Sequence, residues 1–175
     1  MTDALPQQPV GGALERSADG RRWSLTLERE LAHPVEDVWA ALTEAERVAR
    51  WAPFLPGRDL DAPGEVALPV PGEKGPGPRG EVTTLDPPRL LALTWDQDGL
   101  RFALTPTDTG TRLELTHTFA EQEEPSSFAA GWHLCLAALA GTLYGLQVPR
   151  VVGESARAHG WEQLRDQYED LFTAG

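Results

Sequence analysis

The fold of this chain is decided by the stretch Gly131-Trp132-His133-Leu134-Cys135-Leu136-Ala137-Ala138-Leu139-Ala140-Gly141-Thr142-Leu143-Tyr144-Gly145-Leu146. Within it, apolar residues recur at spacings of four, three, four and three, which is the pattern of one helix face. These residues are Trp132, Leu136, Leu139, Leu143 and Leu146. The upstream segments alternate as strands with one apolar face, and such strands need a cover. We therefore expect this helix to lie across the concave face of a curved sheet, with a ligand site between the two.

Composition limits the classes of function. The 175 residues suffice for one domain with a substantial core, and a hydrophobic fraction of 41% fits a folded chain. The formal net charge is −12, from 27 acidic and 15 basic side chains. Because such a surface repels phosphate groups and anionic lipid head groups, we expect neither nucleic acid nor a membrane as a partner.

Three absences narrow the setting further. The single Cys135 excludes an internal disulfide and a zinc site built from cysteines. Residues 1–20 lack a cationic region followed by an apolar run, so no secretory signal is predicted. No apolar stretch is expected to be long enough to span a bilayer. We therefore expect a cytoplasmic protein, and we expect no cofactor.

The first part of the chain predicts a strand followed by two short helices. Period-two alternation predicts the strand over residues 23–31, where Arg29 is the one break in the apolar set. Apolar residues at i, i+3, i+4 and i+7 predict a helix over residues 35–42, entered through Pro34. A capping-box pattern predicts a second helix over residues 43–50.

The middle of the chain has a different composition. Residues 51–80 are rich in proline and glycine, and only residues 65–68 have strand character. We expect residues 69–78 to form a mobile loop. After this possible strand, three further strands are predicted over residues 80–85, 89–95 and 99–105, separated by turn sequences. A last, longer strand is predicted over residues 110–119.

The end of the chain adds helices. Ser126 or Ser127 is expected to cap the quoted helix. Beyond Pro149, a second helical stripe is formed by Trp161, Leu164, Tyr168 and Leu171. We expect three regions: a flexible tail over residues 1–20, one domain over 21–148, and a helical extension over 149–175 packed on the same domain. A homodimer through the stripe of the extension is the alternative.

Five short motifs, taken in order, resemble a known family. They are Pro34-Val35-Glu36-Asp37-Val38-Trp39-Ala40-Ala41-Leu42-Thr43, Arg50-Trp51, Leu85-Asp86-Pro87-Pro88-Arg89-Leu90, Gly110-Thr111-Arg112-Leu113 and Gly131-Trp132. Together with the order of elements, they are similar to the START-like superfamily of polyketide cyclases and lipid-transport proteins. Within it the chain resembles the branch named for the activator of the ninety-kilodalton heat-shock-protein ATPase.

This resemblance implies an α+β helix-grip fold. In that fold a curved antiparallel sheet wraps a long C-terminal helix, and two short helices follow the first strand. No catalytic residues carry over, because the family shares no catalytic set. The chain departs from the common pattern in residues 56–80 and in the helix after Pro149, and we expect either segment to reshape or cover the mouth of the cavity.

Strand alternation selects the side chains that face the long helix. Aromatic residues gather there, and because small-molecule pockets are mostly apolar they favour an apolar or aromatic ligand. The alternative for each of them is a plain core position. The candidate ligand-binding residues are Trp51, Leu93, Trp95, Phe102, Leu115, His117, Trp132 and Leu136.

His117 is the candidate for chemistry. Alternation places it on the inward face with Leu113 and Leu115, where it would hydrogen-bond a ligand or act as an acid or base. The alternative is a histidine satisfied by a neighbouring side chain, since no acid is expected on its face. No metal site is predicted, because His133 and Cys135 at i and i+2 of a helix point about 200° apart.

Three functions compete. The first is non-catalytic binding of a small hydrophobic or amphipathic ligand, which follows from aromatic residues without a convergent acid–base pair. The second is an enzyme of the cyclase or hydrolase type, in stress or secondary metabolism, that uses His117 and a cavity acid. The third, implied by the resemblance alone, is interaction with a chaperone ATPase. The sequence favours the first.

Overall fold

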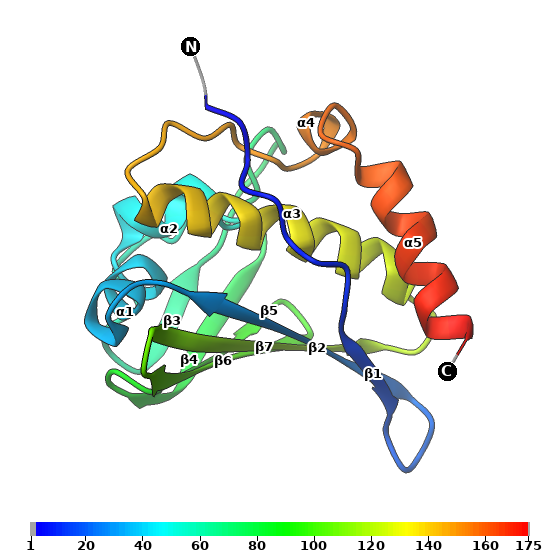
Figure 1. The fold of residues 1–175 in the computed structure, drawn as a ribbon. Helices are drawn as coiled ribbons and strands as arrows, with labels where there is room; N and C mark the ends of the chain where they lie inside the picture. The colour runs from blue at the N-terminus through cyan, green and yellow to red at the C-terminus, as the bar shows by residue number, and fades with distance from the viewer. Residues whose placement is uncertain (1–2, 175) are drawn as a thin grey trace.

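A curved antiparallel sheet grips one long helix in the computed structural model, which describes residues 3–174 (Figure 1). The sheet has seven strands in the order β1-β2-β7-β6-β5-β4-β3. The strands are β1 (Ala13–Arg16), β2 (Arg22–Leu31), β3 (Gly64–Ala67), β4 (Arg79–Asp86), β5 (Leu90–Trp95), β6 (Asp98–Thr107) and β7 (Gly110–Ala120). This is the α+β helix-grip fold that the sequence predicts.

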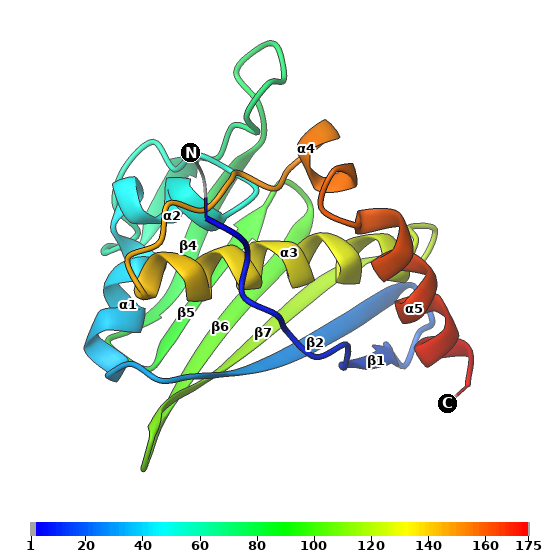
Figure 2. The ribbon, with the colours of Figure 1, turned by 45° about the horizontal axis from the view of Figure 1, so that its top comes forward.

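The helices form a second layer on the concave face of the sheet. They are α1 (Val35–Thr43), α2 (Ala45–Trp51), α3 (Pro125–Leu143), α4 (Glu154–Arg157) and α5 (Trp161–Thr173). Figure 2 shows α3 crossing the strands, with α1 and α2 beside its C-terminal end and α5 beside its N-terminal half. The two short helices after β2 and the long helix after β7 were all predicted from the sequence.

The strand register builds a continuous row of inward side chains beneath α3. His117 pairs with Leu25 on one side and with Leu100 on the other. Leu100 pairs in turn with Leu93, and Leu93 pairs with Val82. Side chains opposite one another in an antiparallel sheet share a face, so His117 sits in the middle of an apolar row.

α3 is buried on nearly all sides. Every residue from Trp132 to Gly141 is buried, which explains why this helix is apolar beyond its predicted stripe. Its 19 residues are long and apolar enough to cross a membrane by length and composition alone, contrary to the sequence analysis. Yet most of the helix is buried inside the domain, as a core helix is.

The ends of α3 also differ from expectation. Pro125 occupies the first turn and Glu124 is the N-cap residue, in place of a serine cap. The hydroxyls of Ser126 and Ser127 donate hydrogen bonds to the Glu124 carboxylate instead. The helix stops at Leu143, so the last predicted residue of its stripe lies outside it.

The segment expected to be a flexible tail contains a strand. β1 pairs with the outer edge of β2, and Leu5 and Leu14 pack against the core. Asp3 anchors the segment further: its N–H donates to the carbonyl of Gln147 at 2.8 Å, and the N–H of Gln147 donates to Asp3 Oδ2 at 2.7 Å. Four residues of alternation are too few to predict such a strand, because its stability comes from pairing with β2.

Candidate functional site

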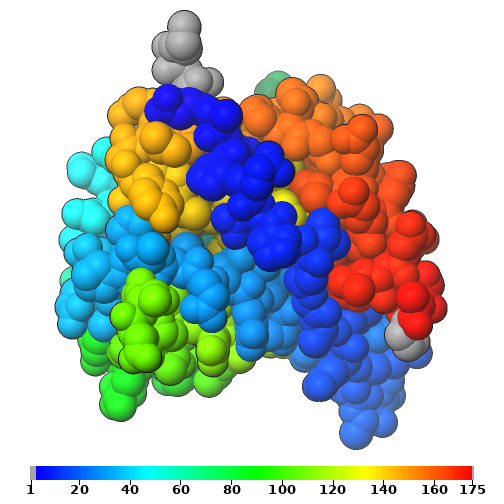
Figure 3. Space-filling model, in the orientation of Figure 1, coloured from blue at the N-terminus to red at the C-terminus, as the bar shows by residue number. Residues whose placement is uncertain are grey.

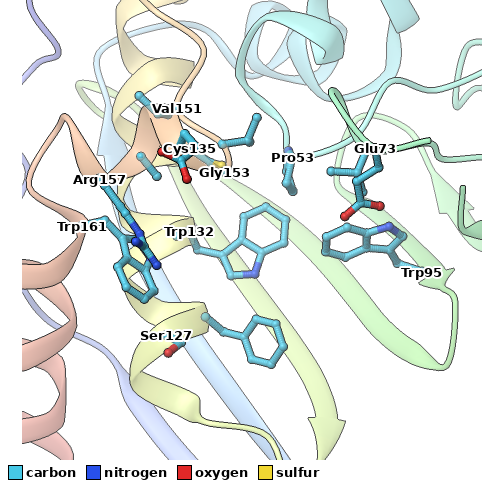
Figure 4. Close-up of a pocket in the computed structure, with 16 residues that line it drawn as sticks. Pro53, Glu73, Trp95, Ser127, Trp132, Cys135, Val151, Gly153, Arg157 and Trp161 are labelled. Carbon is cyan, nitrogen blue, oxygen red and sulfur yellow. The ribbon is translucent and has the colours of Figure 1, made fainter.

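A cavity of about 660 Å³ lies beside α3 (Figure 4). Its walls come from the N-terminal half of α3, the end of β5, the segments before and after β3, and the C-terminal extension. The lining residues are Pro53, Val70, Glu73, Trp95, Ser127, Phe128, Gly131, Trp132, Cys135, Val151, Val152, Gly153, Glu154, Ala156, Arg157 and Trp161. The extension and the proline- and glycine-rich segment thus both contribute walls to the cavity.

The space directly between α3 and the centre of the sheet is filled by side chains. Leu93, Phe102, Leu115 and Leu136 are each at most 2% exposed. Trp51 is also buried, and its Nε1–H donates to the carbonyl of Ala41 at 2.8 Å. Of the eight candidate residues, two line the cavity, Trp95 and Trp132, and six belong to the core: Trp51, Leu93, Phe102, Leu115, His117 and Leu136.

Four aromatic side chains line the cavity: Trp95, Phe128, Trp132 and Trp161. Trp95 and Trp132 meet edge to face, with ring centroids 6.4 Å apart and planes at 70°. Figure 4 shows the Trp132 indole at the centre of the site, Trp95 with Glu73 on one side, and Trp161 with Arg157 on the other. The arrangement offers flat apolar surfaces on three sides and charged groups at the margins.

Trp132 is held by a hydrogen-bonded chain that runs through His117 to Asp98. Its Nε1–H donates to His117 Nδ1 at 2.9 Å, and His117 Nε2 lies 2.8 Å from Asp98 Oδ2. Because Nδ1 accepts a hydrogen bond from the indole, the neutral ring carries its proton on Nε2 and donates it to the carboxylate. The chain fixes the orientation of Trp132 on the cavity wall.

Asp98 is the partner acid that the sequence analysis did not expect beside His117. The same alternation that assigns Leu100 and Phe102 to the inward face also places Asp98 there, two residues earlier on β6. Its position next to a turn obscured this signal. His117 itself is 0% exposed and both ring nitrogens are engaged, so in this structure it is a satisfied histidine that supports Trp132.

Trp95 contrasts with Trp132 in its polar atom. Trp95 Nε1 is buried and has no hydrogen-bond partner among the described residues. A buried N–H without an acceptor costs free energy. Because this nitrogen has almost no accessible surface, a ligand brings an acceptor to it only when the side chains that cover it move aside. Among residues 3–174, three tryptophans line the cavity, and Trp95 is the one whose N–H is buried without a partner.

The thiol of Cys135 reaches the cavity wall but is chemically quiet. Burial raises the pKa of Cys135 to about 12, and the residue is 2% exposed. The thiol therefore stays protonated at neutral pH, and a protonated thiol is a poor nucleophile. The cavity wall thus lacks an activated cysteine.

Several cavity residues lay outside the sequence prediction. Val151, Val152 and Arg157 come from the extension, and Val70 and Glu73 come from the proline- and glycine-rich segment. Neither segment has a period that would reveal which side chains point inward. The only signal was their departure from the family pattern, which led us to expect them at the cavity mouth.

Comparison with known proteins identifies the family. The model for the family "Activator of Hsp90 ATPase homolog 1-like protein" matches residues 32–144, which is more than half of the chain. The chain belongs to this family. The resemblance drawn from the five sequence motifs is therefore confirmed. No curated protein matches the chain.

Solved structures with the same fold extend over nearly the whole chain. The crystal structure of CalU16 from Micromonospora echinospora has a TM-score of 0.72 at 24% identity, covering 94% of this chain and 98% of that one. The conserved protein of unknown function EF2215 from Enterococcus faecalis also has a TM-score of 0.72, at 18% identity, covering 93% and 91%. At these identities the likeness shows the fold alone.

Proposed function

We propose that this family member binds a small, largely aromatic ligand in the cavity beside α3. The ligand is amphipathic: its flat apolar part lies between Trp132 and Trp161, and its hydrogen-bond acceptor reaches Trp95 Nε1 once the side chains that cover this nitrogen move aside. The observation that carries the proposal is the unpaired, buried Nε1–H of Trp95 in a wall of aromatic rings.

The dimensions of the cavity support this proposal. A volume of about 660 Å³ falls within the range of roughly 300–1,000 Å³ that small-molecule sites occupy. Aromatic side chains supply contact area, and a few polar groups set the orientation of the bound molecule. Here Trp95 supplies the orienting donor, while Glu73 and Arg157 lie at the margins and favour a ligand that is polar at its solvent-facing end.

Binding without chemistry fits the polar groups of the cavity best. The two groups most suited to acid–base or nucleophilic catalysis are His117, which lies in the core behind Trp132, and Cys135 on the cavity wall. His117 has both ring nitrogens engaged by Trp132 and Asp98, and Cys135 is a buried, protonated thiol. The proposal therefore assigns the cavity to holding a ligand and gives His117 the role of positioning Trp132.

A matched pair of compounds tests the proposal. We expect 2-acetylnaphthalene and 2-ethylnaphthalene both to raise the melting temperature and to quench tryptophan fluorescence saturably. The ketone should bind on the order of three- to tenfold tighter, because its carbonyl accepts the Trp95 hydrogen bond. Trp95→Phe should abolish this difference while leaving both compounds bound.

Trp23→Phe is the matched control, since Trp23 lies on β2 outside the cavity and its Nε1–H already donates to Glu121. The preference for the ketone should survive that change. If neither compound stabilises the protein, ligand binding in this cavity is refuted. If the ketone preference persists in Trp95→Phe, the assignment of the donor is refuted.

A further inference from the structure

A buried guanidinium lies on the far side of α3 from the aromatic cavity. Arg29, the single polar break in the inward face of β2, is 4% exposed. Its Nη1 donates to the carbonyl of Glu28 at 2.7 Å, and its Nε has no partner. Within residues 3–174, no carboxylate lies within salt-bridge distance of it. A buried cation without a counter-ion is costly, so this position calls for negative charge nearby.

The guanidinium is separated from a small pocket by the ring of His133. Arg29 Nη2 lies 3.4 Å from His133 Nδ1. The hydroxyl of Tyr168 lies 3.0 Å from His133 Nδ1 and 3.5 Å from Arg29 Nη2. A guanidinium only donates, so His133 Nδ1 is an acceptor and the ring proton sits on Nε2. Burial and the charge of Arg29 lower the pKa of His133 to about 4, which keeps the ring neutral at pH 7.

His133 forms part of the wall of a second pocket of about 290 Å³. The pocket lies between the N-terminal segment, α3 and the start of α5; Figure 3 shows the N-terminal segment crossing this face beside the extension. Its polar lining consists of neutral or basic residues: Gln7, Gln8, His133, His159, Gln163 and Gln167. In a chain with a net charge of −12, none of the described lining residues is acidic.

We infer that this second pocket binds a small anion of the carboxylate or phosphate class. His133 Nε2–H and the side-chain amides of Gln163 and Gln167 donate to the anion, while Arg29 supplies the positive potential from behind the imidazole ring. The volume corresponds to about ten water molecules at roughly 30 Å³ each, which leaves room for a small anion together with several water molecules. The site is independent of the aromatic cavity and of the function proposed for it.

NMR of the histidine rings tests the inference on the full chain. Sodium phosphate and sodium acetate are titrated separately at pH 7, with sodium chloride holding the ionic strength constant. We expect one of the two anions to shift the His133 Cε1–H resonance saturably, and the resonance is assigned by its loss in His133→Gln. Saturation by phosphate or by acetate then identifies the class of anion.

Variants separate a specific site from general charge. Gln163→Glu places a carboxylate in the pocket and should weaken anion binding at least tenfold. Gln97→Glu makes the same chemical change on the exposed β5–β6 turn and should leave binding unchanged. Arg29→Met should also weaken binding at least tenfold, and the Gln163 pair decides the question if that variant does not fold.

Two results would overturn the inference. One is the absence of a saturable His133 shift with both phosphate and acetate. The other is equal anion affinity in Gln163→Glu and Gln97→Glu, since a site in this pocket cannot tolerate a carboxylate in its wall.

Discussion

Acidification should destabilise the protein through His133. The pKa of this residue falls from 6.5 to about 4 on folding, because the ring is buried and faces Arg29. Between these two values the unfolded chain binds more protons at His133 than the folded chain does. Stability therefore rises with pH across this window and is lost as pH falls from about 6.5 towards 4.

The size of the effect follows from the two pKa values. Linkage gives a loss of about 2 kcal/mol between pH 7 and pH 5, growing to about 3 kcal/mol at pH 4. This is a large share of the stability of a typical domain, which is roughly 5–15 kcal/mol. The structural cause is that a protonated His133 would place a second positive charge beside Arg29. Among residues 3–174, no carboxylate contacts the imidazole ring or the guanidinium to compensate for it.

Urea unfolding followed by tryptophan fluorescence measures this loss at pH 7 and pH 5. Other groups titrate over the same range, so the wild type is compared with His133→Gln, which keeps an acceptor for Tyr168 but cannot be protonated. The wild type should lose about 2 kcal/mol more than this variant. His159→Gln, which removes an exposed histidine, is the control and should behave as the wild type. Equal pH dependence of the wild type and His133→Gln would refute the reasoning.

Three further outcomes are expected. Gly80→Ala should destabilise the protein by about 3 kcal/mol or more in urea unfolding, because an added Cβ would lie 2.0 Å from the carbonyl oxygen of Thr94; a normal unfolding midpoint would contradict this. Asp98→Ala should cost about 1–3 kcal/mol, since it leaves the buried Nε2–H of His117 without its acceptor, and Asp98→Asn should restore most of the loss. Cys135 should resist Ellman's reagent at pH 8 in the native protein and react on unfolding in urea; rapid native labelling would show that the thiol is accessible.

The parts of the fold that the sequence predicts are those governed by a local period. The alternation of Leu91, Leu93 and Trp95, and the helical spacing of Trp132 and Leu136, report directly which face of each element is buried. These elements form the central sheet and α3, where burial on one face imposes a strict pattern on the residues. The family resemblance rests on other signals as well: its motifs lie in α1, α2, the β4–β5 turn, the start of β7 and α3.

The position of the cavity was beyond such reasoning. Its outer walls come from segments without a period, and residues such as Val70, Val152 and Arg157 reach it only through long-range packing. Periodicity shows that a side chain points inward, but it does not distinguish a filled interior from an open one. Phe102 and Leu115 point inward as predicted and fill the core, whereas Trp161 of the extension lines the cavity.

The covering of α3 by both ends of the chain has a practical consequence. The segment from residue 3 to β1 and the extension from residue 149 to α5 insulate a helix apolar enough to enter a bilayer. The segment after α3 packs closely against the helix, because an added Cβ on Gly141 would lie 2.4 Å from the side chain of Val148. A fragment trimmed to residues 32–144, where the family model matches, would lose this covering. It would also lose β2, which pairs with one edge of β7. Such a fragment would present bare hydrocarbon to water and self-associate, so the working unit of this protein is longer than its family signature.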